Sequence, residues 1–209
     1  MKKLDLRKEY KHLYRPSAKK VSLVDVPALQ FVLVDDQIEP GLAPGTSPSF
    51  QEAMQALYSI AYTLKFMSKG REDDPIDYTV MALEALWWVE QGEFDITHPD
   101  NWRWTAMIMQ PDHISQAMFL QAREQAQAKK PELDMGKLRF ETFQEGLCMQ
   151  IMHVGPYADE PATLAKMDGF ARQEGYRLRG KHHEIYLGDP RRADPAKLKT
   201  VLRHPIEAV

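Results

Sequence analysis

Glu184 is the residue whose type and position most clearly suggest chemistry. It lies in the mostly apolar run 183–187, which has the character of a β-strand, although acidic residues are depleted from strands. Because side chains alternate along a strand, Glu184 and Tyr186 share one face, while Ile185 and Leu187 share the other. If Ile185 and Leu187 face covering helices, Glu184 and Tyr186 face a cleft. The alternative is a carboxylate that faces solvent on an exposed sheet.

Aromatic side chains are numerous enough to surround this carboxylate. The chain contains 4 Trp, 8 Tyr and 8 Phe, and we expect several of these rings to line the cleft, namely Trp87, Trp88, Trp104, Tyr58 and Tyr62. Tyr58 and Tyr62 belong to a helical stripe, and the other interpretation is that this stripe forms only the edge of the core. Rings of this kind stack on flat ligands, and a carboxylate among them attracts cations. The same surroundings suit Glu184 as a general base, with the Tyr186 hydroxyl donating a proton or a hydrogen bond to a developing oxyanion.

The other reactive groups indicate no metal and no organic cofactor. His182 and His183 are neighbours on a strand, so they project to opposite faces and cannot chelate one ion together. The single cysteine, Cys148, lies in an apolar strand, where a buried and inert thiol is expected, and no zinc-ligand spacing is present. The sequence also has no glycine-rich phosphate loop and no G-x-S-x-G motif. Nucleotide hydrolases and serine esterases are therefore excluded.

Composition and charge predict a cytoplasmic protein with a small-molecule partner. A chain of 209 residues with one cysteine has no internal disulfide, which fits a reducing compartment. Its first ten residues are mostly charged, and no apolar run approaches the ~20 residues that cross a membrane, so no membrane association is expected. The net charge is −3, with a basic first segment. Because no nucleic-acid-binding motif accompanies these charges, we expect no nucleic-acid partner.

The elements that must position Glu184 follow a repeated order. Hydrophobic periodicity and capping signals predict an α+β fold with a peripheral segment over 1–17, strands near 21–26, 31–34, 77–89, 102–110, 138–143, 146–153, 183–187 and 200–204, and helices over 48–69, 113–130 and 158–174. Pro27 ends the first strand, and a turn at Gln144–Glu145 separates two later ones. The order strand–helix–strand–strand thus occurs in half one, about 21–110, and in half two, about 138–206, with the helix at 113–130 between them. Such halves would meet around a pseudo-twofold axis and leave a central ligand cleft.

Several motifs resemble the GyrI-like small-molecule-binding family, in its stand-alone branch. These are His-Val-Gly-Pro-Tyr at 153–157 with Glu160, the run 183–192, and the segments 83–88, 104–112 and 197–203. The similarity covers nearly the whole chain after about residue 17, which makes 18–209 one domain. The resemblance implies duplicated SHS2-type halves and a cleft carboxylate, here Glu184, flanked by aromatic side chains that include Tyr157. Ala85 stands where the family pattern leads us to expect glycine.

The resemblance also implies a function. Some stand-alone relatives hydrolyse cyclopropanoid compounds, and relatives fused to DNA-binding domains sense lipophilic cationic drugs. We therefore expect a cofactor-independent hydrolase that detoxifies cyclopropanoid electrophiles, in which Glu184 activates water and Tyr186 assists as an acid or an orienting group. The alternatives are a non-catalytic multidrug-binding protein that sequesters lipophilic cations, and a module that binds a protein partner.

Overall fold

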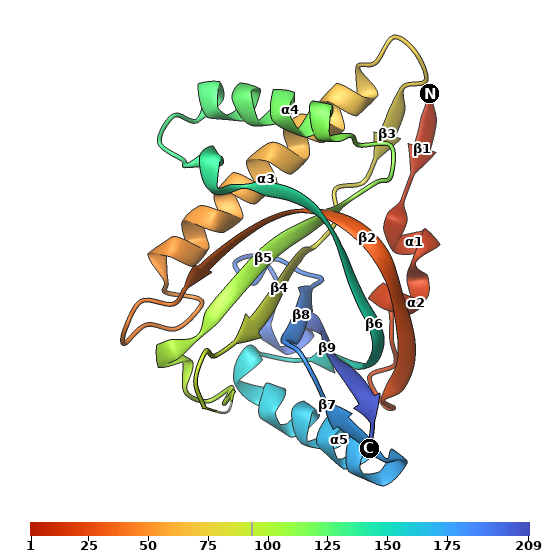
Figure 1. Ribbon diagram of the computed structural model, residues 1–209, viewed down its shortest axis with the longest axis vertical. Coiled ribbons are helices and arrows are strands. Elements are labelled where there is room, and N and C mark those ends of the chain that lie inside the picture. Colours follow the sequence, from red (N-terminus) through yellow and green to blue (C-terminus); the bar gives the residue numbers. More distant parts are fainter. Residues whose placement is uncertain (93) are drawn as a thin grey trace.

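The computed structural model describes residues 1–92 and 94–209 and shows a mixed α+β fold around one curved sheet (Figure 1). The strands are β1 (Lys2–Leu4), β2 (Ser22–Gln37), β3 (Ile76–Tyr78), β4 (Leu83–Trp88), β5 (Arg103–Gln110), β6 (Arg139–Val154), β7 (Tyr176–Leu178), β8 (His182–Tyr186) and β9 (Lys199–Ala208). The α-helices are α1 (Leu6–Glu9), α2 (Lys11–Tyr14), α3 (Pro48–Lys69), α4 (Gln116–Lys129) and α5 (Glu160–Glu174). Short 3₁₀ turns are η1 (Pro99–Asn101), η2 (Met135–Lys137), η3 (Tyr157–Asp159) and η4 (Pro195–Lys197).

Six antiparallel strands close into a barrel-like ring. The sheet order is β6-β2-β5-β4-β8-β9-β7, and an additional pairing of β6 with β9 joins the two sides. β7 lies outside the ring as an extension of β9. Along each strand, alternate side chains therefore point into the ring, and the others point outward towards the helices.

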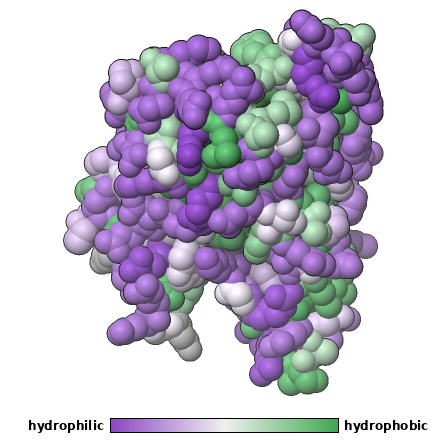
Figure 2. All heavy atoms as spheres, turned by 45° about the horizontal axis from the view of Figure 1, so that its top comes forward, coloured by the Kyte–Doolittle hydropathy of each residue, from purple (hydrophilic) through white to green (hydrophobic). Residues whose placement is uncertain are grey.

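The helices α3 and α5 cover different parts of the outer surface. α3 begins at Ser47, whose side chain accepts a hydrogen bond from the Phe50 backbone, as the capping pattern predicts. It contacts β2 and β5, and α4 packs along it, while α5 lies against β6 at the other end of the ring (Figure 1). On the face seen in Figure 2, hydrophobic side chains form small patches among polar ones. None of the helices in the described residues is both long and apolar enough to cross a membrane.

When β3 and β7, which lie outside the ring, are left aside, the elements follow the predicted order, whereas the duplication and its symmetry stay predictions. Strand–helix–strand–strand occurs as β2-α3-β4-β5 and again as β6-α5-β8-β9. Within each half the first strand pairs with the last, and the last pairs with the third. β2–β6 and β4–β8 are the pairings that join the halves.

Two predicted strand breaks are wrong. Pro27 lies inside the single strand β2, because β2 pairs with β5 only from Gln30 onward, so no ladder hydrogen bond to β5 is lost at the proline. Gln144–Glu145 lies inside the single strand β6, in which Gly146 takes a φ of 73° opposite Val26. Glycine tolerates this left-handed conformation, which bends the strand without ending it.

Three further boundaries differ from the prediction. The strand expected over 77–89 is two strands, β3 and β4, and β3 pairs with β1 outside the ring. The helix expected over 113–130 is α4, which begins only at Gln116, where the Ser115 side chain caps it. The helix expected from Ala158 begins as the short turn η3 and becomes α5 at Glu160.

The N-terminal segment is not peripheral. Leu6, Leu13 and Tyr14 are buried in the main core, and the Tyr14 hydroxyl donates a 2.7 Å hydrogen bond to Glu84 inside the ring. The backbone carbonyls of its second helix are also held, because Gln150 and Arg203 donate hydrogen bonds to them. Because this segment is mostly charged, its composition did not indicate that Leu6, Leu13 and Tyr14 pack into the core.

Candidate functional site

Glu184 lies on the outer face of the ring, between α3 and α5. The strand register places Ala85 of β4 on one side of it and Leu202 of β9 on the other. Trp87, two residues along β4 from Ala85, contacts Phe50 of α3 at 5.1 Å between ring centroids. Leu202 belongs to the small core cluster formed with α5. The Glu184 side chain is only 7 % exposed, which makes it an acidic group in a mostly apolar surrounding.

The orientation expected for β8 is reversed. Ile185, expected to face the helices, is fully buried in the main core inside the ring, whereas Glu184 lies on the outer face, towards the helices. Ala85, its neighbour on β4, is fully buried on the same face. The cleft expected at Glu184 stays a prediction, since the two hollows beside α3 do not include this residue.

Tyr186 holds one side of the carboxylate. Its hydroxyl accepts a 3.1 Å hydrogen bond from the Trp87 indole N–H and lies beside the Glu184 carboxylate. Burial and the nearby Glu184 carboxylate raise the pKa of Tyr186 well above its ordinary value. The Tyr186 proton is therefore strongly retained.

His182 lies on the other side of the Glu184 carboxylate, a contact that the sequence did not predict. Its Nε2 lies 3.2 Å from Oε1 of Glu184, at an angle that leaves Nε2 without a hydrogen bond. The Phe94 ring stacks on the imidazole at 5.7 Å between centroids, and His204 lies against it at 5.9 Å. Burial and then His182 lower the pKa of His204 to about 3, so this neighbour is uncharged.

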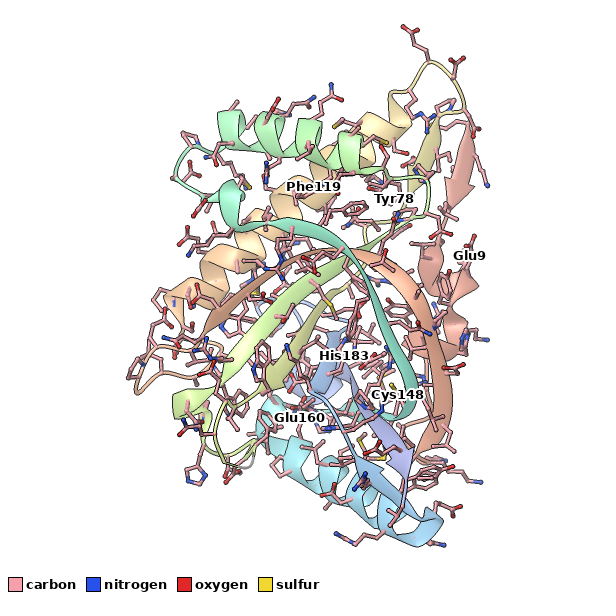
Figure 3. The ribbon with its side chains drawn as sticks, in the orientation of Figure 1. Glu9, Tyr78, Phe119, Cys148, Glu160 and His183 are labelled. Carbon is pink, nitrogen blue, oxygen red and sulfur yellow. The ribbon has the colours of Figure 1, made fainter. Side chains whose placement is uncertain are left out.

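A second carboxyl, Glu160, faces the cleft from the start of α5. It is 2 % exposed, and its Oε1 has no hydrogen-bond partner. Burial and then the Glu184 carboxylate raise the pKa of Glu160 to about 9. Tyr157, just before α5, meets Tyr186 edge-on at 5.9 Å, and burial followed by Glu184 raises the pKa of Tyr157 to about 12. Figure 3 shows Glu160 at the end of α5 nearest the ring.

The structure brings together only some of the predicted rings. Trp87 and Tyr157 lie at Glu184, whereas Trp88 projects to the opposite face, where the Lys181 ammonium lies 3.2 Å from its ring centroid. Trp104 is fully buried behind the cleft, in edge contact with Phe50. Both adjacent tryptophans are expected from the sequence to line the cleft, but only Trp87 lies on the face that carries Glu184.

The two tyrosines of α3 lie further out. Tyr58 is 37 % exposed and lines a hollow along α3 together with Tyr62. Tyr62 is 48 % exposed, and the hollow, of about 320 Å³, is also lined by Phe66, Lys129 and other residues of α3 and α4. This hollow does not include Glu184.

A buried cluster of ionisable side chains lies on the inner face, behind the cleft, and sequence reasoning missed it. His183, labelled in Figure 3, donates from Nε2 to Glu84 and from Nδ1 to Glu145, at 3.0 Å each. Arg203 reaches Glu145 at 3.3 Å. Burial lowers the pKa of His183, but the two glutamates outweigh burial and raise it to about 9. The acidic residue in the apolar run Leu83–Trp88 was a signal that could have led to Glu84.

The described residues contain no group of three or more His, Cys, Asp or Glu side chains that could hold a metal ion. Cys148 is fully buried, and burial raises the pKa of its thiol far above the ordinary value. The chemistry available in the cleft is therefore that of carboxyl, phenol, imidazole and aromatic groups.

Comparison with known proteins gives a consistent family and fold. Residues 19–207 match the model of the GyrI-like small molecule binding domain. An uncharacterised conserved protein from Listeria innocua is 41 % identical, with a TM-score of 0.87 over 98 % of this chain and 100 % of that one. A hydrolase from Listeria innocua is 40 % identical, with a TM-score of 0.85 over 99 % and 100 %. The C-terminal domain of EcmrR shares the fold at 12 % identity, with a TM-score of 0.55 over 91 % and 98 %. No match was found among curated protein sequences.

Proposed function

Because the chain belongs to the GyrI-like small molecule binding domain family, we propose that the cleft at Glu184 binds planar lipophilic molecules, often cationic, and hydrolyses cyclopropanoid electrophiles. The observation that carries the proposal is the buried Glu184 carboxylate. Tyr186, Trp87 and His182 enclose it between α3 and α5. Two solved structures at about 40 % identity are described as hydrolases, which favours catalysis over binding alone.

Binding follows from the rings and the charge. Trp87, Tyr157 and Tyr186 offer faces and edges to a flat ligand. A carboxylate that is largely shielded from water attracts a cationic ligand more strongly than an exposed one. The same carboxylate disfavours flat anions.

Hydrolysis requires Glu184 to act as a base. It takes a proton from water as the oxygen attacks the ring CH₂ of a cyclopropane that is conjugated to a carbonyl group. The strained C–C bond breaks, and its electron pair moves to the carbonyl oxygen, which must then gain a proton. Tyr186, which lies beside the carboxylate, orients it, and no metal or organic cofactor enters the reaction.

The test uses the purified full-length chain with a spirocyclopropyl dienone and a panel of planar cationic dyes. Glu184→Gln should abolish product formation and weaken the dyes, while a neutral isostere of each dye keeps its affinity. Glu52→Gln, on the exposed side of α3, is the matched control and should behave as wild type. Full turnover by Glu184→Gln would exclude the mechanism. Dye binding without product formation in the wild type would favour the sequestering protein instead.

A further inference from the structure

We infer that Glu160 is the acid of this site, a second functional carboxyl that donates a hydrogen bond and then its proton to a carbonyl oxygen of the ligand. The inference rests on the proposed function and extends it, because water addition needs a proton donor as well as a base. It also adds a preference to the ligand class: a planar molecule that carries an acceptor oxygen beside its electrophilic carbon.

Placement supports this role. Glu160 is the first residue of α5 and follows the turn that carries Tyr157, whose ring meets Tyr186 of β8. Thr200, which is paired with Tyr186 in the strand register, lies close enough to Glu160 to influence its pKa. Since Tyr186 and Glu184 share a face of β8, Glu160 is directed at the same row of side chains. Its unpartnered Oε1 is a buried polar atom, and such atoms are rare where no ligand or water completes them.

Protonation of Glu160 follows from its neighbours. The titratable groups that face it are Glu184 and Tyr186 from β8 and Tyr157 from the preceding turn, none of them cationic. A helix N-terminus favours a charged carboxylate, but burial and Glu184 outweigh that effect and raise the pKa of Glu160 to about 9. Glu160 therefore holds its proton at neutral pH.

Tyr186 is unsuited to be the donor. Its oxygen already accepts a hydrogen bond from Trp87, and burial and the Glu184 carboxylate raise its pKa well above the ordinary value of a phenol. A neutral carboxyl is the stronger acid and has an uncommitted oxygen. In this assignment β8 carries the base, Glu184, and the phenol that orients it, Tyr186, whereas α5 carries the acid, Glu160.

The proton balance closes within one turnover. Glu184 gains the proton that water loses, and Glu160 loses the proton that the carbonyl oxygen gains as the C–C bond breaks. The product is the ring-opened alcohol with a hydroxyl in place of the carbonyl. Transfer of the proton from Glu184 back to Glu160, directly or through water, restores the starting state.

The experiment compares wild type, Glu160→Gln and Asp159→Asn, the last an exposed carboxylate one position earlier that serves as the control. Glutamine keeps the size and a hydrogen-bond donor but has no acidic proton. We expect kcat on the spirocyclopropyl dienone to fall by about 10²–10⁴-fold in Glu160→Gln, with KM little changed. The wild-type rate should also decline above pH 9, and this decline should be absent in Glu160→Gln. Near-wild-type kcat and an unchanged alkaline decline in Glu160→Gln would overturn the inference.

A binding measurement separates this inference from the proposed hydrolysis. A neutral planar ketone that cannot react should lose affinity for the wild type by about tenfold per pH unit above pH 9, as Glu160 ionises. Affinity for Glu160→Gln should not vary with pH in that range. If the wild type turns over no cyclopropanoid but shows this dependence, the hydrolysis is refuted and Glu160 stands as the donor to bound ligands. If the dependence is absent from the wild type, the assignment of Glu160 is refuted whether or not the protein is a hydrolase.

Discussion

Nε2 of His183 lies 3.0 Å from Oε2 of Glu84, across the β4–β8 pairing that joins the two halves of the ring. The opposite faces of the same two strands carry Trp87, Glu184 and Tyr186. The buried ion cluster and the cleft are thus two sides of one strand pair. Any change that shifts the register inside the ring also moves the cleft residues outside it.

His183→Gln should destabilise the protein by about 3–5 kcal/mol, because it leaves the carboxylates of Glu84 and Glu145 buried with less positive charge. The pKa of His183 is raised to about 9 in the folded state, against about 6.5 in an unfolded chain. Its contribution is therefore complete below about pH 6.5 and is lost as the pH rises through 9. Urea denaturation between pH 6 and 10 should show this decline in wild type and a flatter profile in His183→Gln.

The control for that series is His12→Gln, whose side chain is exposed. It should reproduce both the stability and the pH profile of the wild type. Identical pH profiles for wild type and His183→Gln would show that the buried histidine is not charged.

Glu145 affects stability at acidic pH. Burial raises its pKa, but His183 and Arg203 outweigh burial and lower it to about 2. Its contribution is present above about pH 4.5 and is lost as the pH falls towards 2.

Tyr14→Phe should cost about 1–3 kcal/mol, since it removes the 2.7 Å hydrogen bond to Glu84 and leaves a buried carboxylate oxygen without a donor. The free energy of unfolding from denaturant titration measures the loss. Tyr10→Phe, at a half-buried ring of the same segment, should change stability by much less. Equal stability of Tyr14→Phe and wild type would mean that the N-terminal segment contributes nothing inside the ring.

Tyr157→Ala should weaken a planar ligand by about tenfold, because it removes a ring that packs edge-on against Tyr186 beside Glu184. Tyr62→Ala is the comparison, since Tyr62 lines the separate hollow along α3. Titration of a fluorescent planar cation measures both affinities. If Tyr62→Ala weakened binding and Tyr157→Ala did not, the ligand would occupy the hollow on α3 and not the cleft.

Cys148 should be inert to a water-soluble thiol reagent in the folded protein, because its side chain is fully buried and its thiol pKa is raised by burial. Labelling should therefore proceed only as fast as the protein unfolds. The measurement is the labelling rate at increasing urea concentrations. Rapid labelling in the absence of urea would contradict the placement of β6 in the ring.

The local patterns of the sequence predict the elements well, for identifiable reasons. The helix over 48–69 has a serine cap, a proline in its first turn and one apolar face, and it is observed as Pro48–Lys69. The strand that carries Glu184 is observed as His182–Tyr186. The false breaks at Pro27 and Gln144–Glu145 arose because a proline and a bent strand resemble turns locally, whereas long-range pairing decides whether the strand continues.

The site is harder to predict, because its members come from distant segments. Alternation alone placed Glu184 and Tyr186 on one face, but only the closed ring determines that this face lies towards the helices. Glu160 and His182 acquire their significance from proximity to Glu184, which sequence spacing does not encode. The inner cluster draws one residue from each of four strands and is likewise invisible in the sequence.

Closure of the ring limits how a ligand can enter. Opening the two halves like a clamshell would break the β2–β6 or the β4–β8 ladder, each a continuous run of backbone hydrogen bonds. Domain rotation about a hinge is therefore an unfavourable route to the cleft. Access must depend on smaller displacements beside Glu184, for example of Tyr157, whose ring packs against Tyr186. Selectivity would then be set at the entrance as well as at the carboxylate.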